Sequence, residues 1–224
     1  MIIAKVKPLE DVKDMIKGYQ RVLNVGCAGC TAICLAGGQR EVETLNAKIT
    51  LAFKAEKVAC FIEGFTVERQ CDMDFLAELD EMVGHYDALL SMACGAGVQF
   101  LAERFPEKRT YPAVDTTFVG VNKDIGWYEE RCQCCGECVL GITGGVCPVT
   151  MCAKVLFNGP CGGSQDGHCE VSKDIPCAWV EIYKRLTKQG RVENILTFHS
   201  ARNWRNQIQA SMVLEDYKKR YLKG

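Results

Sequence analysis

Cysteine is the residue type whose spacing gives this chain its chemistry. The 224 residues include 15 cysteines, and three of them form the pattern C-x2-C-x3-C at Cys27, Cys30 and Cys34. Three thiolates this close in sequence can bind three irons of one cubane, and a [4Fe–4S] cluster then needs a fourth ligand. We expect Cys94 to be that ligand, with Cys71 as the reserve. The alternative is that these cysteines are small core or turn residues.

A second group of cysteines follows the ligand order of bacterial ferredoxins. The pattern is C-x2-C-x2-C and then a Cys-Pro pair, and its members are Cys132, Cys135, Cys138 and Cys147. The last gap, VLGITGGV, is apolar and rich in glycine, so its backbone amides could approach a sulfide closely. The pattern predicts a second [4Fe–4S] cluster, with Cys134 as a bystander.

Four further cysteines follow at wide and even intervals. They are Cys152, Cys161, Cys169 and Cys177. Four thiolates can close a tetrahedral structural zinc site, although the paired C-x2-C knuckles of zinc fingers are missing. We expect one zinc here, and the alternatives are a third cluster or exchange of ligands with the second group. Cys60 lies in an apolar strand pattern and is expected to be a packed small side chain.

Composition excludes several classes of protein. Lys and Arg number 27 against 28 Asp and Glu, so no net charge attracts the chain to nucleic acid or to a membrane surface. No apolar run is long enough for a membrane span, and the first residues lack the pattern of a signal peptide. An odd number of cysteines without an export signal indicates metal binding or redox chemistry in a reducing compartment. We therefore expect a cytoplasmic protein.

The first half of the chain contains the elements that must position the first group of cysteines. Helices are expected from Pro8 and over 37–57, 74–86 and 98–105, and strands over 21–26, 58–65, 88–92 and 114–121. This alternation predicts an α/β fold with a small doubly wound parallel sheet. If the first and third strands are neighbours, in a 2-1-3 order, Cys27 and Cys94 meet at the carboxyl edge of the sheet. A positive helix N-terminus near Cys34 would stabilise an anionic cluster.

The cysteine density changes near residue 126, which predicts two domains. Residues 1–125 form the α/β domain, and residues 126–224 form a Cys/Gly-rich metal-binding domain with a basic, aromatic helical tail. The glycine-rich segment cannot build an ordinary apolar core, so metal coordination must hold it together. Aromatic and arginine residues are typical interface anchors. Candidate partner-binding residues are Trp179, Tyr183, Trp204 and Arg205, and the alternative is that the aromatic residues pack on their own domain.

The motifs together resemble a known family. The run E-R-C-x2-C-G-E-C-V-L-x2-T-G-G-x-C-P-V-T-x-C-A-K, with N-G-P-C-G-G-S after it, is similar to the cysteine-rich C-terminal module of methylenetetrahydrofolate reductase systems. Upstream, C-x2-C-x3-C-L-A-G-G and S-x-A-C-G-x-G-V-Q resemble the rest of the small iron–sulfur subunit found in acetogenic and other anaerobic bacteria. The resemblance covers about residues 20–180, and Cys71 and Cys134 are additions to the pattern.

The resemblance implies an iron–sulfur electron-transfer subunit with no catalytic activity of its own. Its partner would be the flavin-containing catalytic subunit that reduces methylenetetrahydrofolate to methyltetrahydrofolate in one-carbon metabolism, and further redox subunits can join such a complex, with which zinc has also been associated. The chain is too short for a (β/α)8 barrel and shows no flavin or folate site. The alternatives are a zinc-stabilised binding or structural module, and an independent metalloenzyme with an open cluster site.

Overall fold

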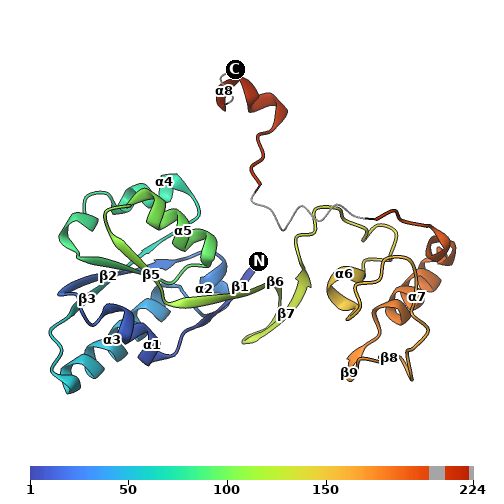
Figure 1. The fold of residues 1–224 in the computed structure, drawn as a ribbon, viewed down its shortest axis with the longest axis horizontal. Coiled ribbons are helices and arrows are strands. Elements are labelled where there is room, and N and C mark those ends of the chain that lie inside the picture. The colour runs from blue at the N-terminus through green and yellow to red at the C-terminus, as the bar shows by residue number, and fades with distance from the viewer. Residues whose placement is uncertain (202–209, 222–224) are drawn as a thin grey trace. The chain divides into compact units, whose positions relative to one another are not determined.

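The computed structural model describes residues 1–201 and 210–221, in two compact units, Met1–Glu130 and Arg131–Gly224 (Figure 1). The N-terminal unit is built on a four-stranded parallel sheet. Its strands are β2 (Arg21–Cys27), β3 (Phe61–Val67), β4 (Ala88–Ser91) and β5 (Arg109–Pro112), in the order β3-β2-β4-β5. The predicted α/β class is confirmed. The predicted 2-1-3 order is also confirmed, because β2 lies between β3 and β4.

Helices cover both faces of the parallel sheet. On one face lie α1 (Leu9–Ile16) and α3 (Gln39–Glu56), and on the other lie α4 (Met73–Leu76) and α5 (Gly95–Arg104) (Figure 1). The short helix α2 (Cys30–Ile33) follows β2 directly. This arrangement buries both faces of the central strands, as is usual for a parallel sheet.

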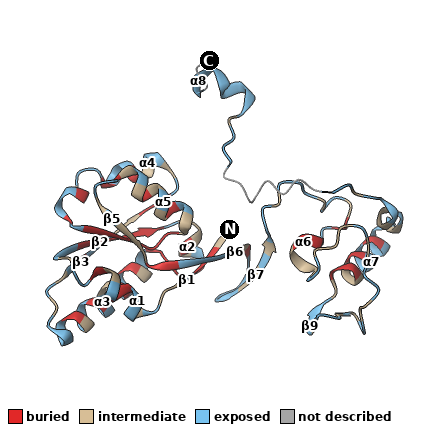
Figure 2. Cartoon of the chain, in the orientation of Figure 1, coloured by how far each residue is buried: buried red, intermediate tan, exposed pale blue. Residues whose placement is uncertain are grey.

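Each face of the sheet has its own apolar core. The side chains of Val12, Ile49 and Phe53 belong to the cluster under α1 and α3. Those of Leu79 and Leu101 belong to the cluster on the other face. Buried residues accordingly follow the strands and the sheet-facing sides of the helices (Figure 2). Apolar side chains therefore bury the sheet on both faces.

The prediction that residues 114–121 form the fourth strand of this sheet is wrong. Strand β6 (Val114–Asp124) instead lies between β1 (Ile2–Val6) and β7 (Trp127–Cys132) in a second, three-stranded sheet, where it pairs antiparallel with β1. The fourth parallel strand is β5, whose sequence RTYP has no apolar run that could predict it. Apolar alternation identified a strand at β6 but not the sheet to which it belongs.

The single helix expected over residues 74–86 is also wrong. The segment forms α4 and two 3-10 turns, η1 (Ala77–Leu79) and η2 (Val83–His85). Its apolar side chains still face the core: Leu76, Leu79 and Val83 are all buried against the sheet. Burial of these side chains was predictable from their spacing, whereas the continuity of the helix was not.

The C-terminal unit contains short elements and one small core. Its elements are α6 (Pro148–Met151), β8 (His168–Cys169), β9 (Ser172–Pro176), α7 (Ala178–Gln189), η3 (Val192–Leu196), η5 (Glu215–Tyr217) and α8 (Lys218–Tyr221). Val146, Trp179, Ile182 and Leu186 form the apolar cluster, beside α6 and α7. Helix α7 ends at Gly190, whose left-handed conformation suits glycine. Within the described residues, no helix is both long and apolar enough to cross a membrane.

Candidate metal centres

Three neighbouring parallel strands each lead into a loop that contains cysteine. Cys27 is the last residue of β2, Cys94 caps the N-terminus of α5 just after β4, and Cys71 follows the end of β3. The carboxyl ends of parallel strands lie at one edge of the sheet, which is where α/β proteins place their sites. The fold therefore brings the Cys27 and Cys94 loops to one edge, and it adds the Cys71 loop to them.

The loop after β3 lies directly beside Cys27. The Cys27 Sγ is 3.9 Å from the carbonyl oxygen of Glu68, at the distance of a weak S–H···O hydrogen bond. The backbone N–H of Ala28 donates to the carbonyl oxygen of Val67 at 2.9 Å. The start of the loop after β2 is thus held against the start of the loop after β3. The contacts on the β3 side are made by Val67 and Glu68, four and three residues before Cys71.

Gln70 fixes this loop to the sheet. Its side chain is fully buried, and its Nε2 donates to the carbonyl oxygens of Val25 (2.7 Å) and Gly26 (3.1 Å). Its Oε1 accepts a hydrogen bond from the Ser91 hydroxyl at 2.6 Å, so one amide joins the ends of β2 and β4. Sequence reasoning missed this residue, because a glutamine between Arg69 and Cys71 carries no motif.

The start of α5 packs against the same glutamine. A Cβ on Gly97 would lie 2.9 Å from the Cβ of Gln70 and 3.6 Å from its carbonyl carbon, so only glycine permits this approach. Burial raises the pKa of the Cys71 thiol, and the neighbouring thiols of Cys27, Cys94 and Cys30 raise it further. Four cysteines, Cys27, Cys30, Cys71 and Cys94, therefore share one electrostatic neighbourhood at the carboxyl edge.

Cys34 lies in the apolar core, where burial raises the pKa of its thiol and the Cys30 thiol raises it further. It is 5% exposed and belongs to the apolar cluster under α1 and α3. Its Sγ accepts a hydrogen bond from the backbone N–H of Ala4 at 3.4 Å and lies 3.6 Å from the carbonyl oxygen of the same residue. The expected helix N-terminus near Cys34 is wrong, because Cys34 follows the last turn of α2 and α3 begins only at Gln39. At this edge Cys94 instead caps the ten-residue helix α5.

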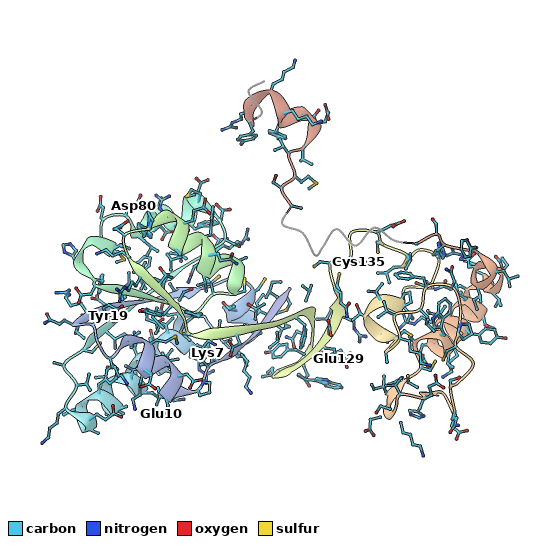
Figure 3. All side chains as sticks on the ribbon, viewed as in Figure 1. Lys7, Glu10, Tyr19, Asp80, Glu129 and Cys135 are labelled. Carbon is cyan, nitrogen blue, oxygen red and sulfur yellow. The ribbon has the colours of Figure 1, made fainter. Side chains whose placement is uncertain are left out.

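The second group of cysteines lines a single cavity in the C-terminal unit. The cavity has a volume of about 260 Å³, and Cys132, Cys134, Cys135, Cys138 and Cys147 all line it. Cys135, labelled in Figure 3, lies on the loop that follows β7. All four predicted ligands are thus brought together, and Cys134 joins them.

Cys134 is held close to its neighbours by an unusual backbone. Its φ of +53° is uncommon for a residue with a side chain, and its N–H donates to the Cys132 Sγ at 3.3 Å. Burial raises the pKa of the Cys134 thiol, and Cys132 and then Cys135 raise it further. N–H donors that point at a sulfur stabilise its thiolate form, which is the form that binds metal.

The third group is less closely assembled. The backbone N–H of Cys177 donates to the carbonyl oxygen of Gly167 at 2.8 Å, at the base of the β8–β9 hairpin that contains Cys169. Cys152 and Cys177 both pack on the apolar cluster of α7, whereas Cys161 is exposed. In the part of the chain that the structure describes, these four thiols do not line a common cavity.

The three groups of cysteines differ in how closely their thiols are assembled. Among residues 1–201 and 210–221, no three His, Cys, Asp or Glu side chains are close enough to hold one metal ion. A cubane places each thiolate on a different iron, so its ligands lie farther apart than those of a single ion. The sheet edge and the cavity each offer at least four thiols, the number and type of ligand that an iron–sulfur cluster takes. The third group offers four thiols but no preformed zinc site.

The predicted partner-binding residues lie in different surroundings. Trp179 is only 6% exposed, and its indole N–H donates to the carbonyl oxygen of Leu156 at 3.0 Å, so it is a core residue of its own unit. Tyr183 is 53% exposed and lines an apolar groove of about 460 Å³ with Leu196. Trp204 and Arg205 lie outside the described residues.

Comparison with known proteins relates part of the chain to one family. Residues 111–205 match the family described as "Methylene-tetrahydrofolate reductase C terminal". No curated protein and no solved structure matches the chain. The matched segment contains the cavity lined by five cysteines and the third group, whereas the cysteine loops at the sheet edge precede it. Residues 111–205 are therefore similar to this reductase C-terminal family.

Proposed function

We propose that the chain is the iron–sulfur electron-transfer subunit of a methylenetetrahydrofolate reductase complex. It holds one [4Fe–4S] cluster at the carboxyl edge of the sheet and a second in the cavity lined by five cysteines. The third group of cysteines holds one zinc. The flavin belongs to a catalytic partner, and the isolated chain is expected to have no folate-reducing activity.

The five cysteines around one cavity carry this proposal. They lie inside the segment that matches the reductase family, and four of them follow the ligand order of ferredoxins. Cys132 and Cys138 are exposed, so a cluster bound there is close to the surface of its unit. A surface position suits a group that exchanges electrons with another protein.

The electron count explains why a flavin partner is needed. Reduction of methylenetetrahydrofolate to methyltetrahydrofolate takes up two electrons and two protons, whereas iron–sulfur clusters supply electrons one at a time. A flavin accepts single electrons and passes a pair on as hydride. The cysteines of this chain position the one-electron groups, and a one-electron donor of another protein is oxidised twice for each folate reduced.

Contact with the flavoprotein is assigned to the face of α7 that carries Tyr183. Tyr183, Leu196 and Phe198 leave large apolar surfaces exposed, and the first two line the same groove. Aromatic side chains at the rim of an apolar groove are common interface anchors. The basic residues of the tail, Arg205 among them, would add charge to this contact.

The proposal is tested by metal analysis followed by kinetics. Protein purified anaerobically with its flavoprotein should contain about eight irons, a similar amount of acid-labile sulfide and one zinc for each copy of this chain. Reduction of the clusters should then reduce the flavin in stopped-flow experiments, and omission of this chain should slow that step. A colourless protein that contains zinc alone would instead support the structural module.

A further inference from the structure

We infer that the fourth ligand of the cluster at the sheet edge is Cys71, and that Cys34 is a core residue. The ligand set is then Cys27, Cys30, Cys71 and Cys94. The inference depends on the proposed function for the presence of a cluster. It goes beyond that function because it draws the ligands from three loops and leaves out one member of the C-x2-C-x3-C pattern.

Strand order provides the first argument. Strand β2 is flanked by β3 on one side and β4 on the other, so the loops after all three strands leave the same edge. The β2 loop offers Cys27 and Cys30, the β4 loop offers Cys94, and the β3 loop offers Cys71. A cubane needs ligands from several directions, and three converging loops supply them.

Packing around Gln70 provides the second argument. This fully buried side chain holds its loop against the ends of β2 and β4 through hydrogen bonds of 2.6–3.1 Å. On its other side, the Gln70 backbone meets Gly97 in the first turn of α5, three residues after Cys94. Cys71 is the next residue after Gln70, so the core holds its backbone close to the loops of the other ligands.

Burial of Cys34 in the core provides the third argument. To reach a cluster, its Sγ would have to leave both the backbone of Ala4 and the apolar cluster in which it is 5% exposed. That movement would open a cavity beside β1 and leave the Ala4 N–H without its sulfur acceptor. Cys71 is exposed and can turn toward the other thiols at little cost.

The revised ligand set also gives the cluster an orientation. Cys27 is buried, Cys30 and Cys94 are half-buried, and Cys71 is exposed. A cluster held by these residues would be nearest to solvent at Cys71 and most deeply buried at Cys27. Electron exchange with another protein would take place at the Cys71 corner.

Alanine variants of the full chain, purified anaerobically with the flavoprotein, test the ligand set. Cys71→Ala should lose about four of the irons, or leave a three-iron cluster with its own EPR signal, whereas the matched control Cys34→Ala should keep all of them. Cys94→Ala should behave like Cys71→Ala. Full iron content and an unchanged EPR spectrum in Cys71→Ala, with loss of iron in Cys34→Ala, would overturn the inference.

Alkylation of the wild-type protein gives a second test that does not depend on how a variant folds. With the clusters bound, Cys71 should resist iodoacetamide, and after removal of iron it should react quickly because it is exposed. Cys34 should be slow to react as long as its unit stays folded. Fast alkylation of Cys71 in the iron-loaded protein would contradict the inference. Wild-type protein without iron would refute the proposed function itself, and the inference with it.

Discussion

The two units hold their cysteines in opposite ways. In the N-terminal unit, the cysteine loops start from the ends of parallel strands that are buried by an apolar cluster on each face. In the C-terminal unit, the cysteines lie on loops between short elements, around one small cluster beside α7. If the proposed clusters are present, we expect the first unit to fold before it binds its cluster and the second to need its metal in order to fold.

The backbone of the C-terminal unit supports this distinction. Between β7 and α6 the chain forms only turns and bends, and residues 134, 136, 144 and 145 have positive φ. Such a segment buries little apolar surface to offset its loss of conformational entropy. Under the proposed function, bonds from thiolate to iron would supply the remaining stability of the cavity.

Removal of the metals should therefore have the largest effect, and only on one unit. After chelation, backbone amides over residues 132–177 should exchange with solvent at rates close to those of an unfolded chain. Amides of β2, β4 and α3 should remain protected, because their core contains no metal. Hydrogen exchange followed by mass spectrometry measures both units in one sample. Equal loss of protection in the two units would refute the prediction that only the C-terminal unit depends on metal for its fold.

Replacement of Trp179 by alanine should have the next largest effect on stability. This side chain is 6% exposed and belongs to the only large apolar cluster that the structure describes for the C-terminal unit. Trp179→Ala should therefore lower the free energy of unfolding of that unit by about 3–5 kcal/mol. The exposed neighbour Tyr183 on the same helix is the matched control, and Tyr183→Ala should change that free energy by no more than about 0.5 kcal/mol. Denaturant titrations of the metal-loaded protein provide the measurement. Similar losses for both variants would mean that α7 has no core role.

The same contrast explains what the sequence could predict. The parallel order around β2 followed from apolar runs and alternating elements, and the grouping of Cys132, Cys135, Cys138 and Cys147 followed from their spacing. Spacing could not show that Cys34 lies in the apolar cluster, because the direction of a side chain depends on the path of the chain after β2 and not on its distance from Cys30. It also missed Gln70, whose role exists only where three loops meet.

Replacement of Gln70 should lower the free energy of unfolding of the N-terminal unit. The loss should be smaller than the loss that Trp179→Ala causes in the C-terminal unit. Gln70→Leu removes the hydrogen bonds of this amide to two carbonyl oxygens and to the Ser91 hydroxyl, which should cost about 1–3 kcal/mol. The exposed neighbour Arg69 is the control, and Arg69→Ala should be nearly neutral. In Gln70→Leu, iron should be lost faster from the sheet edge than from the cavity, as followed by EPR. Equal rates of loss would show that Gln70 does not position the Cys71 loop.

The smallest expected effect concerns a phenol in the N-terminal core. Tyr86 is 5% exposed and donates a hydrogen bond to Glu63; burial, followed by this hydrogen bond, raises the pKa of Tyr86 to about 12. The folded unit therefore keeps this proton between pH 10 and 12, where the unfolded chain releases it, so stability from this group is complete below pH 10 and falls as the pH rises through 12.

Tyr86→Phe should cost about 1 kcal/mol near neutral pH, through loss of the hydrogen bond to Glu63. The difference in unfolding free energy between wild type and variant should shrink from pH 10 upward, because only the wild type has this phenol to ionise. Since the group lies in a core without metal, removal of iron should leave the difference unchanged. A difference that disappeared with the iron would mean that the N-terminal unit, like its neighbour, depends on its cluster to fold.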